Sequence, residues 1–369
     1  MNRYFYYNVF LVSLLNLLIF VPHILVLYRY DGAITSMVLA AAVGSTVAIV
    51  FTNILRKFPG QGLPEILDQF LPRPFTIALL IFMAVMWLIA SSIALVSYAV
   101  LINRFFNPDT SPFVVLLFMV LVCVYTASRS SLTVMFVIEM GLIINMPLLA
   151  FLLIKAVRSN AIDWDAIRTI ANYWRESPKL RPFAAATFVF TGYINMAIYN
   201  RLAPANFRLR HRWMIPAFGT LILLITFFVP IGFHGTETVD DYLYLWSVTS
   251  DSMLMSYGFI ERVIFFFLLL YLNLTLIYTT SGWHQAMEFV KSCMPKKRDP
   301  KSGKHNTPLI NWIVTGVFAI ITLSYSELFD EKENFYISIY WLIFRMFIEV
   351  GTVIFLFILI RTKRRKPSV

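Results

Sequence analysis

The stretch FAAATFVFTGYINMAIY, residues 183–199, is apolar enough to cross a bilayer, but Thr191-Gly192 interrupts it near the middle. Glycine costs a helix about 1 kcal/mol relative to alanine. Backbone groups freed inside a membrane must find partners in protein or ligand, and secondary transporters place discontinuous helices of this kind at their substrate sites. The alternative is an unbroken span whose glycine serves helix packing. We expect a broken helix here.

The composition of the whole chain is that of a membrane protein. Of its 369 residues, 59% are hydrophobic and only 14% are charged, and the mean hydropathy is +0.72. The net charge of +11 comes from short basic runs between apolar stretches. Such runs are typical of membrane-protein loops and not of a nucleic-acid-binding face. The two cysteines, Cys123 and Cys293, are too few for a disulfide framework or a metal cluster.

The apolar runs predict an all-α integral membrane protein with about ten transmembrane helices. The first run continues too far for a cleavable signal peptide. Lys and Arg are more frequent in the loops on the side of the C-terminus, so we expect both termini in the cytoplasm and a basic tail at residues 361–369. The expected spans cover residues 5–28, 33–55, 75–102, 112–127, 131–157, 183–201, 213–231, 259–285, 308–326 and 336–360.

Two connecting loops point to an inverted repeat. FPGQGLPEILDQFLPRP, residues 58–74, follows the second expected span and predicts a short amphipathic helix. Residues 238–253 follow the seventh expected span. If each half has five helices, the seventh span is the second helix of its half, so this loop corresponds to the loop 58–74. The two loops then lie on opposite sides of the membrane, as an inverted repeat requires. We expect one membrane domain, 1–369, built from the halves 1–157 and 183–360.

The first helix of each expected half carries an interruption. In the first half these are Asn16 and Pro22-His23, and in the second half Gly192. Proline removes a backbone donor and breaks the regular helical pattern. Interruptions at corresponding positions strengthen the expectation that both leading helices are broken.

The chain resembles the B-subunit family of spore nutrient germinant receptors, relatives of amino-acid permeases in the amino acid/polyamine/organocation superfamily. The resemblance rests on length, span count, Phe58-Pro59-Gly60 with Leu63-Pro64-Glu65-Ile66, and Tyr257-Gly258-Phe259-Ile260-Glu261-Arg262. Members usually have a Gly-Phe-Glu break in the sixth span, where this chain has Thr191-Gly192-Tyr193-Ile194. The resemblance implies a LeuT-type fold, a nutrient such as an amino acid bound mid-membrane, and an A-type membrane subunit and a C-type lipoprotein as partners.

In such a fold the ligand is expected between the two breaks, with the third and eighth spans as walls. A carboxylate suits the amides at a half-helix N-terminus, where the helix dipole favours negative charge. Each candidate also has an ordinary structural reading, because small and hydroxyl residues mediate helix packing in lipid. The candidates are Asn16, Leu17 and Pro22 of the first span, Trp87, Ser91 and Ser92 of the third, and Thr191, Gly192 and Tyr193 of the sixth.

Ionisable and hydroxyl side chains inside the spans form a second group of candidates. Glu139 is either a coupling carboxylate or a structural one paired with a neighbouring hydroxyl or arginine. Arg345 and Glu349 are four residues apart and are expected to pair with each other. Thr279 and Thr280, at the hydroxyl-rich end of the eighth span, form a candidate cation site with carbonyls of the broken first span, although threonines also bond their own backbone.

The expected function is a germinant-receptor subunit in the spore inner membrane or the cell membrane that binds a small nutrient. The alternative is a proton- or sodium-coupled amino-acid transporter. Both share one fold and one site, so the sequence does not separate them. It has no GxxxxGK[ST] phosphate loop, and its five histidines are scattered, so we expect neither an enzyme nor a cofactor or metal.

Overall fold

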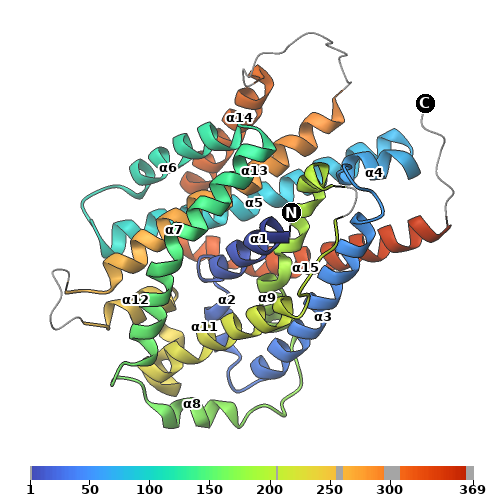
Figure 1. The fold of residues 1–369 in the computed structure, drawn as a ribbon. Helices are drawn as coiled ribbons and strands as arrows, with labels where there is room; N and C mark the ends of the chain where they lie inside the picture. Colours follow the sequence, from blue (N-terminus) through green and yellow to red (C-terminus); the bar gives the residue numbers. More distant parts are fainter. Residues whose placement is uncertain (1, 205–206, 255–260, 295–307, 363–369) are drawn as a thin grey trace.

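The computed structural model describes residues 2–204, 207–254, 261–294 and 308–362, and in this part of the chain the regular secondary structure is entirely helical (Figure 1). The basic tail beyond Thr362 and the motif residues 257–260 lie outside it. The elements are α1 (Asn2–Leu14), η1 (Leu15–Leu17), α2 (Val21–Leu27), α3 (Ala33–Leu55), α4 (Leu63–Phe70), α5 (Arg73–Phe105), α6 (Pro112–Ala127), α7 (Ser131–Val157), α8 (Trp164–Ala171), α9 (Leu180–Thr187), η2 (Phe188–Asn195), α10 (Met196–Tyr199), η3 (Asn200–Leu202), α11 (Met214–Thr238), η4 (Val239–Asp241), α12 (Leu245–Asp251), α13 (Ile264–Cys293), α14 (Leu309–Leu328) and α15 (Glu331–Thr362).

Seven helices of the described chain are long and apolar enough to cross a membrane, namely α3, α5, α7, α11 with η4, α13, α14 and α15. If the bent pair formed by α1–η1 and α2 is counted as one span, the described residues contain up to eight candidate spans. The two remaining expected spans are α6, which has 16 residues, and the irregular segment from α9 to η3. These elements define an integral membrane protein.

The first expected span is broken. Its two parts meet at an angle of 54°, and Phe20 has a left-handed backbone with φ of 56°. Pro22 lies in the first turn of α2, where a missing N–H is tolerated. Side chains from other helices satisfy carbonyls at the break: Tyr271 donates to Leu14 O at 2.9 Å, and Ser338 donates to Ile19 O at 3.1 Å. Side chains of the protein itself therefore satisfy these two backbone carbonyls at the break.

The sixth expected span changes its winding but does not open. Phe188–Asn195 forms eight residues of 3-10 helix between α9 and α10, with helical backbone at both ends. The α-helix is thus interrupted at Thr191-Gly192, as expected, but by continuous 3-10 turns and not by a gap. Contact of half-helix ends with a ligand stays a prediction. A Cβ on Gly192 would lie 2.4 Å from Asn8 O and 2.5 Å from Val9 Cα. Glycine is needed here because η2 crosses directly against the backbone of α1, which is the packing role that the sequence left as an alternative.

The connecting segments contain the short helices expected of them. In the loop 58–74, α4 begins after Gly62, whose N–H donates to Glu65 Oε2 at 2.9 Å. In the loop 238–253, η4 and α12 connect α11 toward α13. Between α7 and α9, the Asp163 side chain caps α8, and α8 buries Ala166 and Ile170 against α11.

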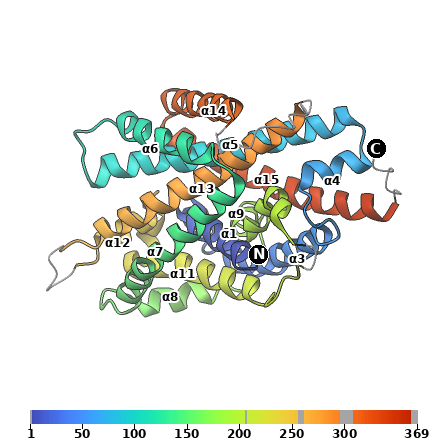
Figure 2. The same ribbon diagram turned by 45° about the horizontal axis from the view of Figure 1, so that its top comes forward.

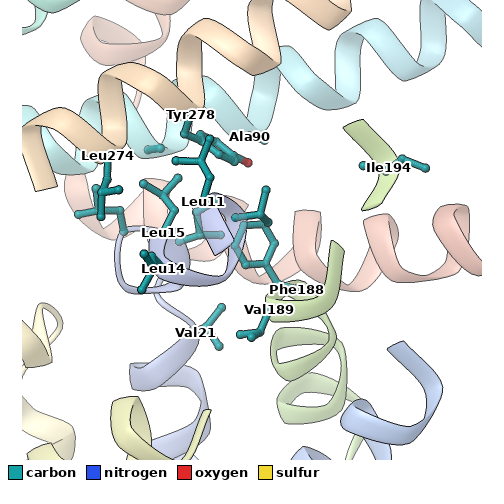
Figure 3. Packing of buried hydrophobic residues seen from close by; sticks show 14 of the residues in the cluster. Leu11, Leu14, Leu15, Val21, Ala90, Phe188, Val189, Ile194, Leu274 and Tyr278 are labelled. Carbon is teal, nitrogen blue, oxygen red and sulfur yellow. The ribbon is translucent and has the colours of Figure 1, made fainter. Parts of the chain in front are cut away.

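The two expected halves pack into each other. Helix α13 runs along α5, and η2 packs on α1, so each contact joins one element from residues 1–157 with one from 183–360. Figure 2 shows α6 and α14 together on one side of the α5–α13 pair and α8 with α11 on the other. The core at the α1–α2 break contains Leu14, Leu15 and Val21 with Phe188 and Val189 of η2 (Figure 3).

Candidate functional site

A cavity opens beside η2, where four long elements converge. The volume that the centre of a water-sized sphere can occupy is about 50 Å³. This is enough space for a few water molecules or a very small ligand. Its walls are mainly aromatic and aliphatic, and Phe188, Ile194 and Tyr278 of this lining appear in Figure 3. The lining consists of Val12 on α1, Met83, Met86 and Trp87 on α5, Phe188, Thr191 and Ile194 on η2, Tyr278 on α13, and Trp341, Arg345, Ile348 and Glu349 on α15.

One corner of this cavity is charged. Arg345 is only 3% exposed, and its Nη1 donates to Glu349 Oε2 at 2.8 Å and to the hydroxyl of Thr191. Thr191 in turn donates to Glu349 Oε2 at 3.1 Å. The arginine, carboxylate and hydroxyl therefore form a closed triangle that joins α15 to the 3-10 segment.

The other guanidinium nitrogens hold Arg345 against α9. Nη2 donates to Ala184 O at 2.9 Å and to Thr187 Oγ1 at 2.8 Å. The guanidinium carbon lies 5.5 Å from the ring centroid of Phe188, within the range of a cation–π contact. Arg345 Nε is buried and has no hydrogen-bond partner among the described residues. Because a buried donor without a partner is costly, this N–H favours an acceptor from a ligand or a water.

Two of the predicted ligand residues line this cavity, Trp87 and Thr191. Three others lie elsewhere along the first span. Asn16 donates to Thr226 Oγ1 at 3.3 Å, and Leu17 and Pro22 line a separate, smaller cavity with His23.

The remaining predicted residues of the third and sixth spans do not line the cavity. Ser91 is fully buried beside Gly282, and its hydroxyl has no hydrogen-bond partner in the described part of the chain. Ser92 bonds the hydroxyl of Thr322 at 2.8 Å. Gly192 packs on α1, and the ring of Tyr193 lies against Phe51 with centroids 5.4 Å apart.

The candidate coupling residues have protein partners, with one exception. Glu139 forms an ion pair with Arg3 at 3.1 Å, the structural alternative stated for it. Thr280 bonds the hydroxyl of Thr126 at 2.7 Å. Thr279 is buried, and no described residue forms a hydrogen bond with its hydroxyl.

The charged corner is the part of the cavity that the sequence did not indicate. The expected ion pair between Arg345 and Glu349 is present, but the i,i+4 spacing gave no sign that it contacts Thr191, 154 residues earlier than Arg345. The available signal was the presence of two charges inside an apolar span, where ionisable residues are rare and mark functional sites.

The long apolar helices and the cavity between them describe an integral membrane protein with a small internal cavity. The chain belongs to the family of spore germination proteins, because the family model with that description matches residues 9–331. This family is not a class of enzymes. No curated protein matches the chain. Arg345 and Glu349 lie on α15, beyond the matched residues.

Proposed function

We propose that this chain is the membrane subunit of a spore germinant receptor and that it binds a small, amino acid-like nutrient in the cavity beside Thr191. The observation that carries the proposal is the charged corner of an otherwise apolar cavity. Ligand sites in proteins usually combine apolar walls with a few placed polar groups. Membership in the spore germination family supplies the biological setting.

The charged corner suits a zwitterion. The carboxylate of an amino acid is the natural partner for Arg345 Nε, the donor left without an acceptor. Its ammonium group suits Glu349, the only carboxylate among the described lining residues, and the aromatic rings near it. A small apolar side chain would then contact Met83 and Met86.

Binding can trigger germination only if the ligand favours one conformation over another. The cavity is walled by α1, η2, α5, α13 and α15, so a bound nutrient contacts both expected halves. We propose that the resulting shift is passed to an A-type membrane subunit and a C-type lipoprotein in the spore inner membrane. The alternative, a proton- or sodium-coupled transporter, uses the same cavity but moves the ligand across the membrane.

The proposed ligand class can be tested by thermal unfolding of the purified chain with each common amino acid. A ligand at 100 times its Kd stabilises the folded state by about 2.7 kcal/mol, which raises the unfolding midpoint. We expect a response to a small set of zwitterions and none to their decarboxylated or amide derivatives. No response to any amino acid would contradict the proposal.

Flux measurements separate receptor from transporter. The chain is reconstituted alone in liposomes, and uptake of the binding amino acid is measured under a proton or sodium gradient. We expect binding without robust uptake. Gradient-driven accumulation in the absence of partner subunits would favour the transporter.

A further inference from the structure

A buried hydroxyl group in the wall of the cavity beside Thr191 is not used by the contacts described above. Tyr278 lies on α13 and is 1% exposed, and its hydroxyl forms no hydrogen bond with any described residue. Tyr278 lines the cavity, and Figure 3 shows its side chain leaving α13 in the direction of Phe188 and Ile194, which line the cavity as well. Because a buried hydroxyl without a partner is costly, a polar group inside the cavity would stabilise it.

The position of the Tyr278 ring is set by aromatic packing. The ring meets that of Trp87 on α5 edge to face, with the two ring centroids 6.3 Å apart, which is a favourable geometry for an aromatic pair. Trp87 lines the same cavity, and α5 and α13 run along each other. Packing therefore holds the hydroxyl in the cavity wall without the help of a hydrogen bond.

The same cavity has a second buried donor without a partner among the described residues, Arg345 Nε on α15. The charges of Arg345 and Glu349 both lie near enough to act on the Tyr278 hydroxyl. The volume open to the centre of a water-sized sphere is only about 50 Å³, so one small molecule can reach both donors. Arginine Nε only donates, and a phenol hydroxyl donates strongly to an anionic oxygen. Two such donors match the two oxygens of one carboxylate.

The charge balance of the cavity restricts the ligand further. Arg345 is already paired with Glu349 at 2.8 Å. A simple carboxylate anion would therefore bring an unbalanced negative charge into the interior of a membrane protein, which is expensive. A ligand that carries its own ammonium group is neutral overall. A water molecule could also accept from both donors, but a carboxylate accepts stronger hydrogen bonds than a neutral oxygen does.

We propose that Tyr278 determines specificity: its hydroxyl donates to the carboxylate of the bound nutrient, and Arg345 Nε donates to the same carboxylate. This inference rests on the proposed function of the cavity. The bound carboxylate then connects α13 with α15. The pair of donors selects amino acids over their decarboxylated amines, and the neutrality of the cavity selects them over simple carboxylate anions.

The test is equilibrium binding to Tyr278→Phe. The probe is the labelled amino acid that most raises the unfolding midpoint of the unchanged chain. Since the substitution keeps the ring and its contact with Trp87, we expect the Kd to rise at least about tenfold through loss of the hydroxyl alone. Tyr340→Phe is the matched control and should keep the original Kd, because Tyr340 is 66% exposed on α15 and lies outside the lining.

The outcomes separate this inference from the proposed function. Equal affinity in Tyr278→Phe and Tyr340→Phe would overturn the role of Tyr278 and leave the proposed function in place. If no amino acid raises the midpoint of the unchanged chain, both are overturned.

A second measurement distinguishes a ligand contact from a structural role. Because the Tyr278 hydroxyl has no partner in the described part of the chain, Tyr278→Phe without ligand should unfold at the midpoint of the unchanged chain or above it. The probe should raise the midpoint of this variant by less than that of the unchanged chain. A lower midpoint of the ligand-free variant would show that the hydroxyl stabilises the fold, and would contradict the assignment.

Simple carboxylates test the requirement for an ammonium group. Acetate and propionate should not raise the midpoint of the unchanged chain at concentrations at which the probe does. A response to either anion as large as that to the probe would contradict the selection of neutral ligands.

Discussion

Arg345 on α15 donates a hydrogen bond to the hydroxyl of Thr191 on η2. This contact joins the long terminal helix to the 3-10 segment, and both line the same cavity. A change in the cavity therefore acts on two elements at once. Several consequences can be measured.

The ion pair of Arg345 with Glu349 should show strong coupling. Arg345→Met leaves a buried carboxylate without its cation, so we expect the free energy of unfolding to fall by about 3–5 kcal/mol. Arg345→Met combined with Glu349→Leu removes both charges and should recover most of that loss. Chemical unfolding of the single and double variants gives the coupling energy, and additive effects would show that the pair does not interact.

Gly192→Ala should destabilise the fold. The new Cβ would lie 2.4 Å from Asn8 O, a backbone atom that cannot rotate away, and we expect a loss of roughly 1–3 kcal/mol. Gly316→Ala on α14 is the matched control, because among the described residues no atom beyond its own helix backbone and chain neighbours lies within 4 Å of its Cβ position. This control should be neutral or stabilising by up to about 1 kcal/mol. Equal effects of the two changes would mean that η2 does not pack closely on α1.

Arg201 should hold the C-terminal end of the sixth expected span against neighbouring helices. It pairs with Glu65 at 2.8 Å and Glu288 at 2.7 Å, and so ties η3 to α4 and α13. In a Cys123→Ala background, Arg201→Gln should increase the rate at which a thiol reagent modifies Cys293, the last residue of α13 and five residues beyond Glu288. The exposed Arg56 provides the control variant Arg56→Gln. The same rate in both variants would argue against this role.

Trp87 should limit the size of the ligand. Trp87→Leu removes an aromatic wall of the cavity, so we expect the binding preference to move by at least about tenfold toward amino acids with larger side chains. Phe82→Leu, on the same helix but outside the lining, should leave the preference unchanged. Competition binding with small and large amino acids measures the ratio. An unchanged ratio in Trp87→Leu would place the ligand elsewhere.

Hydropathy and proline placement predicted much of the fold. The long spans follow from apolar runs, and the bend before α2 coincides with Pro22. Thr191-Gly192 predicted an interruption of the α-helix, but not that residues 188–195 form a 3-10 helix packed closely on the backbone of α1. Local spacing cannot show an approach between distant segments.

The same limit applies to the site. The spacing of Arg345 and Glu349 predicts that they pair, but only the packing of α15 against η2 brings them to Thr191. The segment Thr191-Gly192-Tyr193-Ile194 carries no carboxylate of its own, and Glu349 on α15 presents one to it. A contact between residues so far apart in the chain is a property of the tertiary structure.

The central claim is that the cavity beside Thr191 and Arg345 binds the nutrient. Its most direct test is equilibrium binding of a labelled amino acid to the purified chain and to two neighbouring variants. Ile348→Trp fills the cavity from α15, whereas Phe347→Trp changes an exposed residue outside it. The account predicts that binding is lost in Ile348→Trp and retained in Phe347→Trp, and equal affinity in both variants would contradict it.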